Sequence, residues 1–169
     1  MEKGVVCVTG GTGYVASWLI MRLLQQGYAV NTTVRSHPDK KKDVSYLTNL
    51  PGASERLRIF NADLNIPESF NESIQGCIGV FHTAHNTDFE GKDGEETNTK
   101  RSIDATISIL QACVDSKTVK RVVYTASSAL PEALKETPLN NYFGFLFRSN
   151  IHSFSSKCNH INETSQQAS

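Results

Sequence analysis

Short apolar runs recur along the first 125 residues of the chain, separated by segments of mixed polarity. Each run is of strand length and most are rich in β-branched residues; the runs cover 4–9, 28–34, 57–60, 77–81 and 121–125. Runs of this kind are typical of strands that are covered on both faces, as in a parallel sheet. The pattern therefore predicts five buried strands.

The segments between these runs carry the spacing of amphipathic helices. The first helix is expected to stop at Gly27, and its apolar positions are Val15, Leu19, Ile20, Leu23 and Leu24. A second helix is predicted from Pro67, near its first turn, to Gly76 at its far end. A short helix is expected in the basic, polar segment after residue 34. One face of a long helix is predicted from Ile103, Ile107, Leu110 and Val114.

Strands that alternate with helices predict an α/β fold. This order favours a Rossmann-type doubly wound parallel sheet with right-handed crossovers, which we assign to residues 1–130. Residues 131–169 show no further strand–helix unit, because an aromatic cluster is followed by a stretch rich in Ser, Asn and Gln. We therefore expect a sheet that is incomplete at its C-terminal side and a divergent, partly disordered tail.

Charge and composition indicate which kinds of molecule the protein binds. Lys and Arg number 17 and Asp and Glu number 17, so no overall charge favours a nucleic acid or a membrane surface. No segment has the pattern of a signal peptide or the apolar length of a membrane span. We expect a soluble, cytoplasmic protein that acts on a small molecule.

Three of the four cysteines and one of the five histidines have a structural interpretation. Cys7, Cys77 and Cys113 fall in apolar segments and are expected to be buried, reduced thiols. His82 is expected to be a packed, hydrogen-bonded core residue, and Trp18 is expected to pack against the fold. Three residues of metal-binding type in the polar tail are too weak a signal to predict a metal site; they are His152, Cys158 and His160.

A glycine motif lies where the first strand turns into the first helix. In "VTGGTGYVAS", Gly10, Gly13 and Ala16 fit the pattern G-x-x-G-x-x-A. The first glycine permits a tight turn, the second lets a diphosphate approach the backbone, and the small third residue lets helix and strand pack closely. The alternative is a plain strand-to-helix turn, but the strand before and the helix after the motif favour dinucleotide binding at the helix N-terminus.

The end of the second strand bears on the choice of dinucleotide. An NAD site usually has an acidic residue there, which binds the ribose hydroxyls. This chain has Arg35, followed by a lysine cluster at 40–42. A guanidinium suits a 2′-phosphate, so NADP(H) is the predicted cofactor. A solvated basic loop without a ligand remains the alternative.

With these features in place, the chain resembles the extended short-chain dehydrogenase/reductases. Within them it is similar to the plant dihydroflavonol 4-reductase, vestitone reductase and cinnamoyl-CoA reductase group. The segments that carry the resemblance include "VCVTGGTGYVASW", "GYAVNTTVR", "DVSYLTNLPGASERL", "NADL", "GVFHTA" and "SKTVKRVVYTAS". The resemblance extends over residues 4–128 and implies a C-terminally truncated reductase that uses NADP(H) and acts on a flavonoid or phenylpropanoid carbonyl.

The resemblance also implies roles for individual residues. Around the diphosphate it places Gly10, Gly13, Tyr14 and Val15. Arg35 and Lys42 would bind the 2′-phosphate, and Asp63 and Leu64 would flank the adenine. At the ends of the fourth and fifth strands, the residues implied to line the cofactor are Thr83, Ala84, His85 and Thr125. His85 and the following Asn86 depart from the small residues or proline usual in relatives.

Catalysis in the family needs a hydroxyl that polarises the carbonyl and a Tyr-x-x-x-Lys pair that donates the proton. The hydroxyl falls on Ser127, with Ser128 as the weaker candidate. The pair is absent from the sequence, because no tyrosine is followed four residues later by lysine. We therefore expect little or no turnover from this chain. The alternative function is a non-catalytic dinucleotide-binding module or a regulatory partner of a full-length reductase.

Overall fold

The computed structural model describes residues 3–35, 43–85 and 95–125, except for the side chains at 95–99 and 101. Within these ranges the chain forms a five-stranded sheet in which all neighbouring strands are parallel. The strands are β1 (Val5–Thr9), β2 (Ala29–Val34), β3 (Leu57–Asn61), β4 (Gly79–His82) and β5 (Arg121–Tyr124). The predicted strands and the Rossmann-type α/β class are confirmed, whereas the predicted tail, residues 131–169, lies outside the described residues.

The strand order is β3-β2-β1-β4-β5. The chain builds the sheet outward from β1 to β3, and then returns to the other side of β1 to place β4 and β5. In register, Val6 of β1 lies between Val30 of β2 and Gly79 of β4. The winding thus reverses between β1 and β4, and ligands of open α/β sheets bind at the carboxyl ends of the strands at such a switch point.

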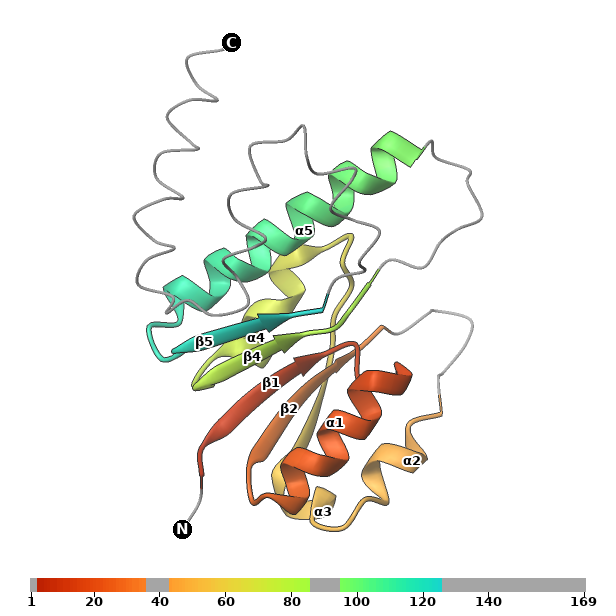
Figure 1. Cartoon of the computed structure of the whole chain (residues 1–169), viewed down its shortest axis with the longest axis vertical. Coiled ribbons are helices and arrows are strands. Elements are labelled where there is room, and N and C mark those ends of the chain that lie inside the picture. The colour runs from red at the N-terminus through yellow and green to blue at the C-terminus, as the bar shows by residue number, and fades with distance from the viewer. Residues whose placement is uncertain (1–2, 36–42, 86–94, 126–169) are drawn as a thin grey trace.

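Helices cover both faces of the sheet (Figure 1). One face carries α1 (Tyr14–Gln25), α2 (Ser45–Thr48) and α3 (Ala53–Arg56), and the other carries the 3-10 helix η1 (Pro67–Phe70), α4 (Asn71–Ile74) and α5 (Glu95–Asp115). Helix α1 ends just before Gly27, as predicted. Helix α3 was not predicted, because four residues are too few for a periodic pattern. The helix predicted from Pro67 to Gly76 is divided between η1 and α4.

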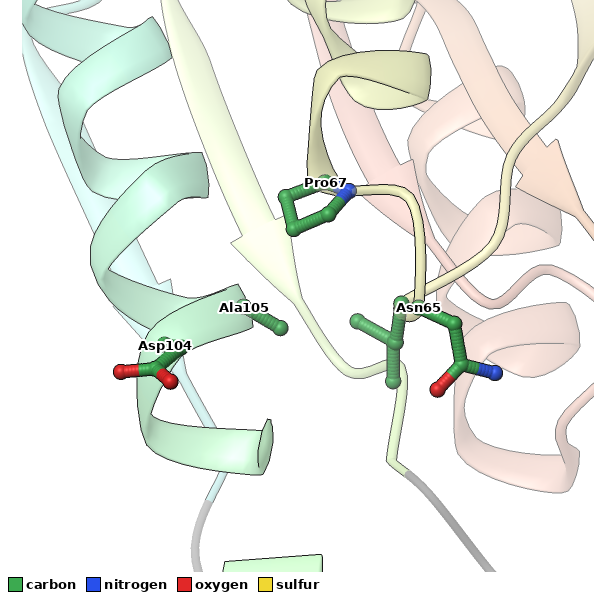
Figure 2. Close-up of a pocket in the computed structure, with 5 residues that line it drawn as sticks. Asn65, Pro67, Asp104 and Ala105 are labelled. Carbon is green, nitrogen blue, oxygen red and sulfur yellow. The ribbon is translucent and has the colours of Figure 1, made fainter. Parts of the chain in front are cut away.

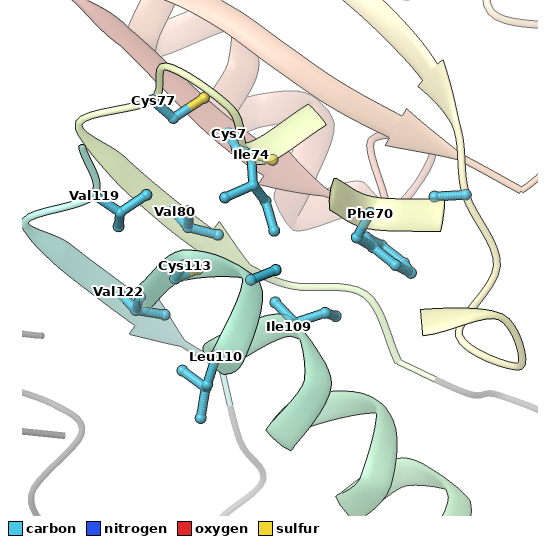
Figure 3. Packing of buried hydrophobic residues seen from close by; sticks show 12 residues of the cluster. Cys7, Phe70, Ile74, Cys77, Val80, Ile109, Leu110, Cys113, Val119 and Val122 are labelled. Atoms are coloured by element: carbon cyan, nitrogen blue, oxygen red, sulfur yellow. The ribbon is translucent and has the colours of Figure 1, made fainter. Parts of the chain in front are cut away.

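The sheet separates two apolar cores, because alternate side chains of each strand point to opposite faces. Val6 and Val8 pack under α1, α2 and α3, whereas Cys7 points into the cluster under η1, α4 and α5 (Figure 3). Cys77 and Cys113 lie in the same cluster, and all three cysteines are free thiols. Burial raises the pKa of Cys77 to about 11 and that of Cys113 to about 12, so both are protonated and unreactive at neutral pH.

The buried face of α5 matches the predicted face in part. Leu110 is 6% exposed and Val114 packs against the apolar cluster, as predicted. Thr106, Ile109 and Cys113 are buried, whereas Ile107 is 38% exposed. The neighbouring Ala105 and Ala112 are also buried. A pattern based on large aliphatic residues does not include such small side chains. The long helix is thus confirmed, and its predicted face is confirmed at Leu110 and corrected at Ile107.

This orientation predicts different costs for two isoleucines on the same helix. Ile109→Ala should lower the free energy of unfolding by about 2–5 kcal/mol, because Ile109 is fully buried and the truncation leaves a cavity. Ile107→Ala should cost less than about 1 kcal/mol, since that side chain already contacts solvent. Urea unfolding of both variants measures the difference. Equal costs would contradict the orientation of α5.

Candidate functional site

The glycine loop between β1 and α1 is held against β2. The amide of Gly10 donates to Thr33 Oγ1 (3.0 Å), and the amide of Gly11 donates to the carbonyl oxygen of Thr33 (2.8 Å). The amide of Gly13 donates to the carbonyl oxygen of Gly10 (2.9 Å). These three amides are therefore occupied inside the protein. Thr33, which is buried, was missed as a functional residue by the sequence reasoning.

The amides of the first turn of α1 remain available. Helix α1 begins at Tyr14, and the amide of Ser17 is the first that donates to a helical carbonyl, that of Gly13 (2.9 Å). The amides of Tyr14, Val15 and Ala16 have no acceptor within the described ranges. Together with the positive end of the helix dipole, they form a site that can bind the oxygens of a phosphate.

Two side chains around this turn are more exposed than the sequence pattern predicts: Val15, expected among the apolar positions of the helix, and Trp18. Tyr14 is 90% exposed and Val15 is 58% exposed, so both face the solvent side of the glycine loop. Ala16 is buried against the sheet, as the small third position of the motif requires. Trp18 was expected to pack but is 57% exposed, with the Arg22 guanidinium 5.9 Å from its ring centroid. Its indole lies on the exposed side of α1, beside the Arg22 guanidinium and outside the apolar core.

The loop after β4 touches the glycine loop. Gly10 has φ +72°, and a Cβ at this position would lie 2.9 Å from the Cα of Ala84. The hydroxyl oxygen of Thr9 lies 3.1 Å from the amide nitrogen of Thr83 and 3.0 Å from that of Ala84. Both amides donate to it. The ends of β1 and β4 are thus joined at the point where the winding of the sheet reverses.

Two further predicted cofactor residues follow β3. The Asp63 carboxylate accepts a hydrogen bond from the amide of Asn65 (2.9 Å), so one of its oxygens is used in a local turn. Leu64 is half-buried beside this turn. A cavity of about 480 Å³ lies between the turn and α5, lined by Leu64, Asn65, Pro67, Asp104 and Ala105 (Figure 2).

The parallel sheet brings the predicted site residues to one edge. Arg35 directly follows β2 and is half-buried. The residues that directly follow β4 are Thr83, Ala84 and His85, and the residue that directly follows β5 is Thr125. All of them, with the glycine loop and the turn after β3, therefore lie at the carboxyl ends of their strands. Predicted residues Lys42 and Ser127 lie outside the described residues. The described ranges contain no group of three or more His, Cys, Asp or Glu side chains that could hold a metal ion.

His82 is a buried, hydrogen-bonded residue, as predicted. It is 3% exposed, its Nδ1 lies 2.9 Å from Thr9 Oγ1, and its ring centroid lies 5.2 Å from that of Tyr124. Burial, with a smaller contribution from His85, lowers the pKa of His82 from 6.5 to about 4. The imidazole is therefore neutral at physiological pH.

This pKa predicts an acid-dependent loss of stability. Between pH 6.5 and about 4 the unfolded chain binds a proton at His82 that the folded chain does not bind. The free energy of unfolding should therefore fall by about 3 kcal/mol as the pH is lowered through this interval, with no contribution from this group above it. Urea unfolding across the interval should show a smaller loss in His82→Asn, which cannot titrate. Parallel curves for the two proteins would contradict the lowered pKa.

Known proteins are similar to this chain over most of its sequence. The sequence profile of the NAD dependent epimerase/dehydratase family matches residues 6–146. Vestitone reductase of Medicago sativa is 59% identical over 127 residues, which are 75% of this chain and 39% of that protein. Dihydroflavonol 4-reductase of Gerbera hybrida is 50% identical over 127 residues, which are 75% of this chain and 34% of that protein.

Solved structures show the same similarity. The crystal structure of vestitone reductase from alfalfa (Medicago sativa) gives a TM-score of 0.64 at 55% identity, covering 75% of this chain and 37% of that one. Gre2 of Candida albicans, solved with NADPH, gives a TM-score of 0.63 at 27% identity, covering 74% of this chain and 37% of that one.

The chain thus spans less than two fifths of the length of these relatives. Among the helices that the structure describes, none has the length and apolarity needed to cross a membrane. The glycine loop, the strand order and the profile match over most of the sequence agree with one another. On this evidence the chain belongs to the NAD dependent epimerase/dehydratase family.

Proposed function

We propose that residues 1–130 bind NADP(H) along the carboxyl edge of the sheet, as the cofactor-binding part of a cytoplasmic reductase that acts on a flavonoid or phenylpropanoid carbonyl. The observation that carries the proposal is the first turn of α1, where three amides that follow the glycine loop have no acceptors in the described ranges. The names of the similar proteins, vestitone reductase and dihydroflavonol 4-reductase, support the substrate class.

The described residues fit such a cofactor. Gly10 has no side chain to obstruct the contact between the two loops, and the amides of Tyr14 and Val15 would bind the diphosphate. Arg35 would bind the 2′-phosphate of NADP(H), which favours it over NAD(H). The presence of NADPH in the Gre2 structure supports this choice.

The remaining predicted residues have proposed roles at the adenine, the diphosphate, the 2′-phosphate and the nicotinamide half. Asp63 and Leu64 would flank the adenine, and Gly13 would admit the diphosphate. Lys42 would add a second cation at the 2′-phosphate. The residues that would line the nicotinamide half are Thr83, Ala84, His85 and Thr125.

A bound nicotinamide would supply the hydride that reduces the carbonyl carbon. The hydroxyl of Ser127 would donate a hydrogen bond to the carbonyl oxygen and so stabilise the charge that develops there. The oxygen must also receive a proton, for which the family uses Tyr-x-x-x-Lys, and this sequence contains no such pair. We therefore expect the chain to bind the cofactor and to turn over substrate several orders of magnitude more slowly than a complete reductase.

The missing pair also favours a second candidate function, a dinucleotide-binding module that regulates a full-length reductase. The two candidates differ in turnover and not in cofactor binding. If substoichiometric amounts of this chain alter the rate of vestitone reductase while the chain itself is inactive, the regulatory function is supported.

Calorimetric titration of the 169-residue chain tests the cofactor proposal. We expect saturable binding of NADPH and weaker binding of NADH. An NADPH oxidation assay with vestitone or a dihydroflavonol should show no turnover above background, with vestitone reductase as the positive control. A chain that unfolds cooperatively but binds neither dinucleotide would refute cofactor binding, and turnover close to that of vestitone reductase would refute the expected inactivity.

A further inference from the structure

Thr9 and His82 form a buried polar pair at the junction of β1 and β4. Thr9 is fully buried and His82 is 3% exposed. The Thr9 hydroxyl oxygen has three neighbours within hydrogen-bonding distance: the His82 Nδ1 atom at 2.9 Å, the Thr83 amide at 3.1 Å and the Ala84 amide at 3.0 Å. Polar groups this deep in the sheet must satisfy one another, since a buried group without a partner is costly.

Counting donors and acceptors determines the direction of each bond. A threonine hydroxyl has one hydrogen to donate and two lone pairs to accept with. The amides of Thr83 and Ala84 can only donate, so they occupy both lone pairs. The hydroxyl hydrogen must then point to His82 Nδ1, which accepts it. His82 is therefore neutral, with its proton on Nε2.

The opposite arrangement does not fit. If His82 donated from Nδ1, the Thr9 oxygen would have to accept three hydrogen bonds and its own hydrogen would have no acceptor on these neighbours. One of the amides of Thr83 and Ala84 would then lose its partner. The position of a single proton on His82 thus controls whether both amides of the loop after β4 remain bound.

We propose that His82 is a positioning residue for the cofactor site. By accepting the Thr9 hydroxyl at Nδ1, it fixes the Thr83 and Ala84 amides and so presses the loop after β4 against the glycine loop. The contact between these loops is close, because a Cβ on Gly10 would lie only 2.9 Å from the Ala84 Cα. The effect on binding rests on the proposed NADP(H) function, whereas the direction of the hydrogen bonds does not.

The protonation of the two imidazole nitrogens of His82 tests the direction of the hydrogen bonds directly. In the folded, ¹⁵N-labelled chain at neutral pH, nitrogen NMR should show Nδ1 of His82 without a proton and Nε2 with one. The amides of Thr83 and Ala84 should be protected from hydrogen exchange. A proton on Nδ1 would overturn the inference whether or not the chain binds a dinucleotide.

Substitutions test whether the protection of the two amides and the binding of NADPH depend on His82. His82→Leu removes the acceptor, and both amides should exchange about tenfold faster, with NADPH binding weakened about tenfold. His82→Asn keeps an acceptor oxygen near the position of Nδ1 and should restore both properties. Val80→Ala is the matched control, since Val80 is buried on the same strand with its side chain in the apolar cluster. It should lower stability without affecting either property.

Variants at Thr9 provide a second test in case the His82→Leu protein does not fold. Thr9→Ser keeps the hydroxyl and should behave as the wild type, whereas Thr9→Val should reproduce the loss expected for His82→Leu. Equal weakening of NADPH binding in Thr9→Val and Val80→Ala would overturn the positioning role. If the wild-type chain binds no NADPH, the proposed function fails, and the tautomer and exchange measurements still decide the direction of the hydrogen bonds.

Discussion

Arg35→Glu should reverse the cofactor preference of this chain. Arg35 directly follows β2, at the edge of the sheet where the glycine loop also lies. Loss of a charge-assisted hydrogen bond to the 2′-phosphate, together with repulsion by the new carboxylate, should weaken NADPH binding by about 100-fold. A carboxylate can accept hydrogen bonds from the ribose hydroxyls of NADH, so NADH binding should be retained or improved.

Calorimetric titration of both dinucleotides measures the ratio of the two affinities. Arg58→Glu is the matched control, because it makes the same charge change at an exposed position within β3, before the carboxyl edge. It should leave the ratio near that of the wild type. If Arg35→Glu and Arg58→Glu shift the ratio equally, the preference comes from overall charge and Arg35 does not contact the 2′-phosphate.

Gly10→Ala should abolish dinucleotide binding and destabilise the fold by about 2–4 kcal/mol. Two costs add at this position. The backbone has φ +72°, which disfavours any side chain, and the new Cβ would lie 2.9 Å from the backbone of Ala84. Either the loop after β4 moves away from the glycine loop, or the glycine loop itself is distorted.

Gly76→Ala separates these two costs. Gly76 has nearly the same backbone conformation, φ +73°, but nothing lies within 4 Å of a Cβ built there. Its cost should therefore be the conformational one alone, about 1–2 kcal/mol, and NADPH binding should be unchanged. Urea unfolding and titration of both variants make the comparison. Similar stability losses would show that the contact with Ala84 is not tight in solution.

Much of the site was predictable because its elements have local signals. The strands follow from apolar runs, and the glycine motif is a contiguous segment between a strand and a helix. Parallel strands place their carboxyl ends at one edge, so the glycine loop and Arg35 could be assigned to a common site without knowledge of distances, whereas Asp63 and Thr83 were assigned through the family resemblance. The family resemblance added roles to these positions.

The site residues that the sequence did not identify bind partners that are distant along the chain. Thr33 binds the glycine loop from 23 residues away, and Thr9 and His82 are separated by 73 residues. A threonine at a strand end has no local feature that identifies such a partner. The same limit explains the buried face of α5, where Ala112 and Cys113 lie in the apolar cluster with strand residues and Ile107 does not.

The sequence by itself determined the order of strands and helices, the position of the glycine loop and the cation that follows β2. These features follow from short-range periodicity and from the conformational freedom of glycine, which act within a few residues. Only the tertiary structure decided which hydroxyls hold the loops and which nitrogen of His82 accepts a hydrogen bond. Such choices depend on the number of donors and acceptors that meet at one buried point, and the fold brings them there from separate strands.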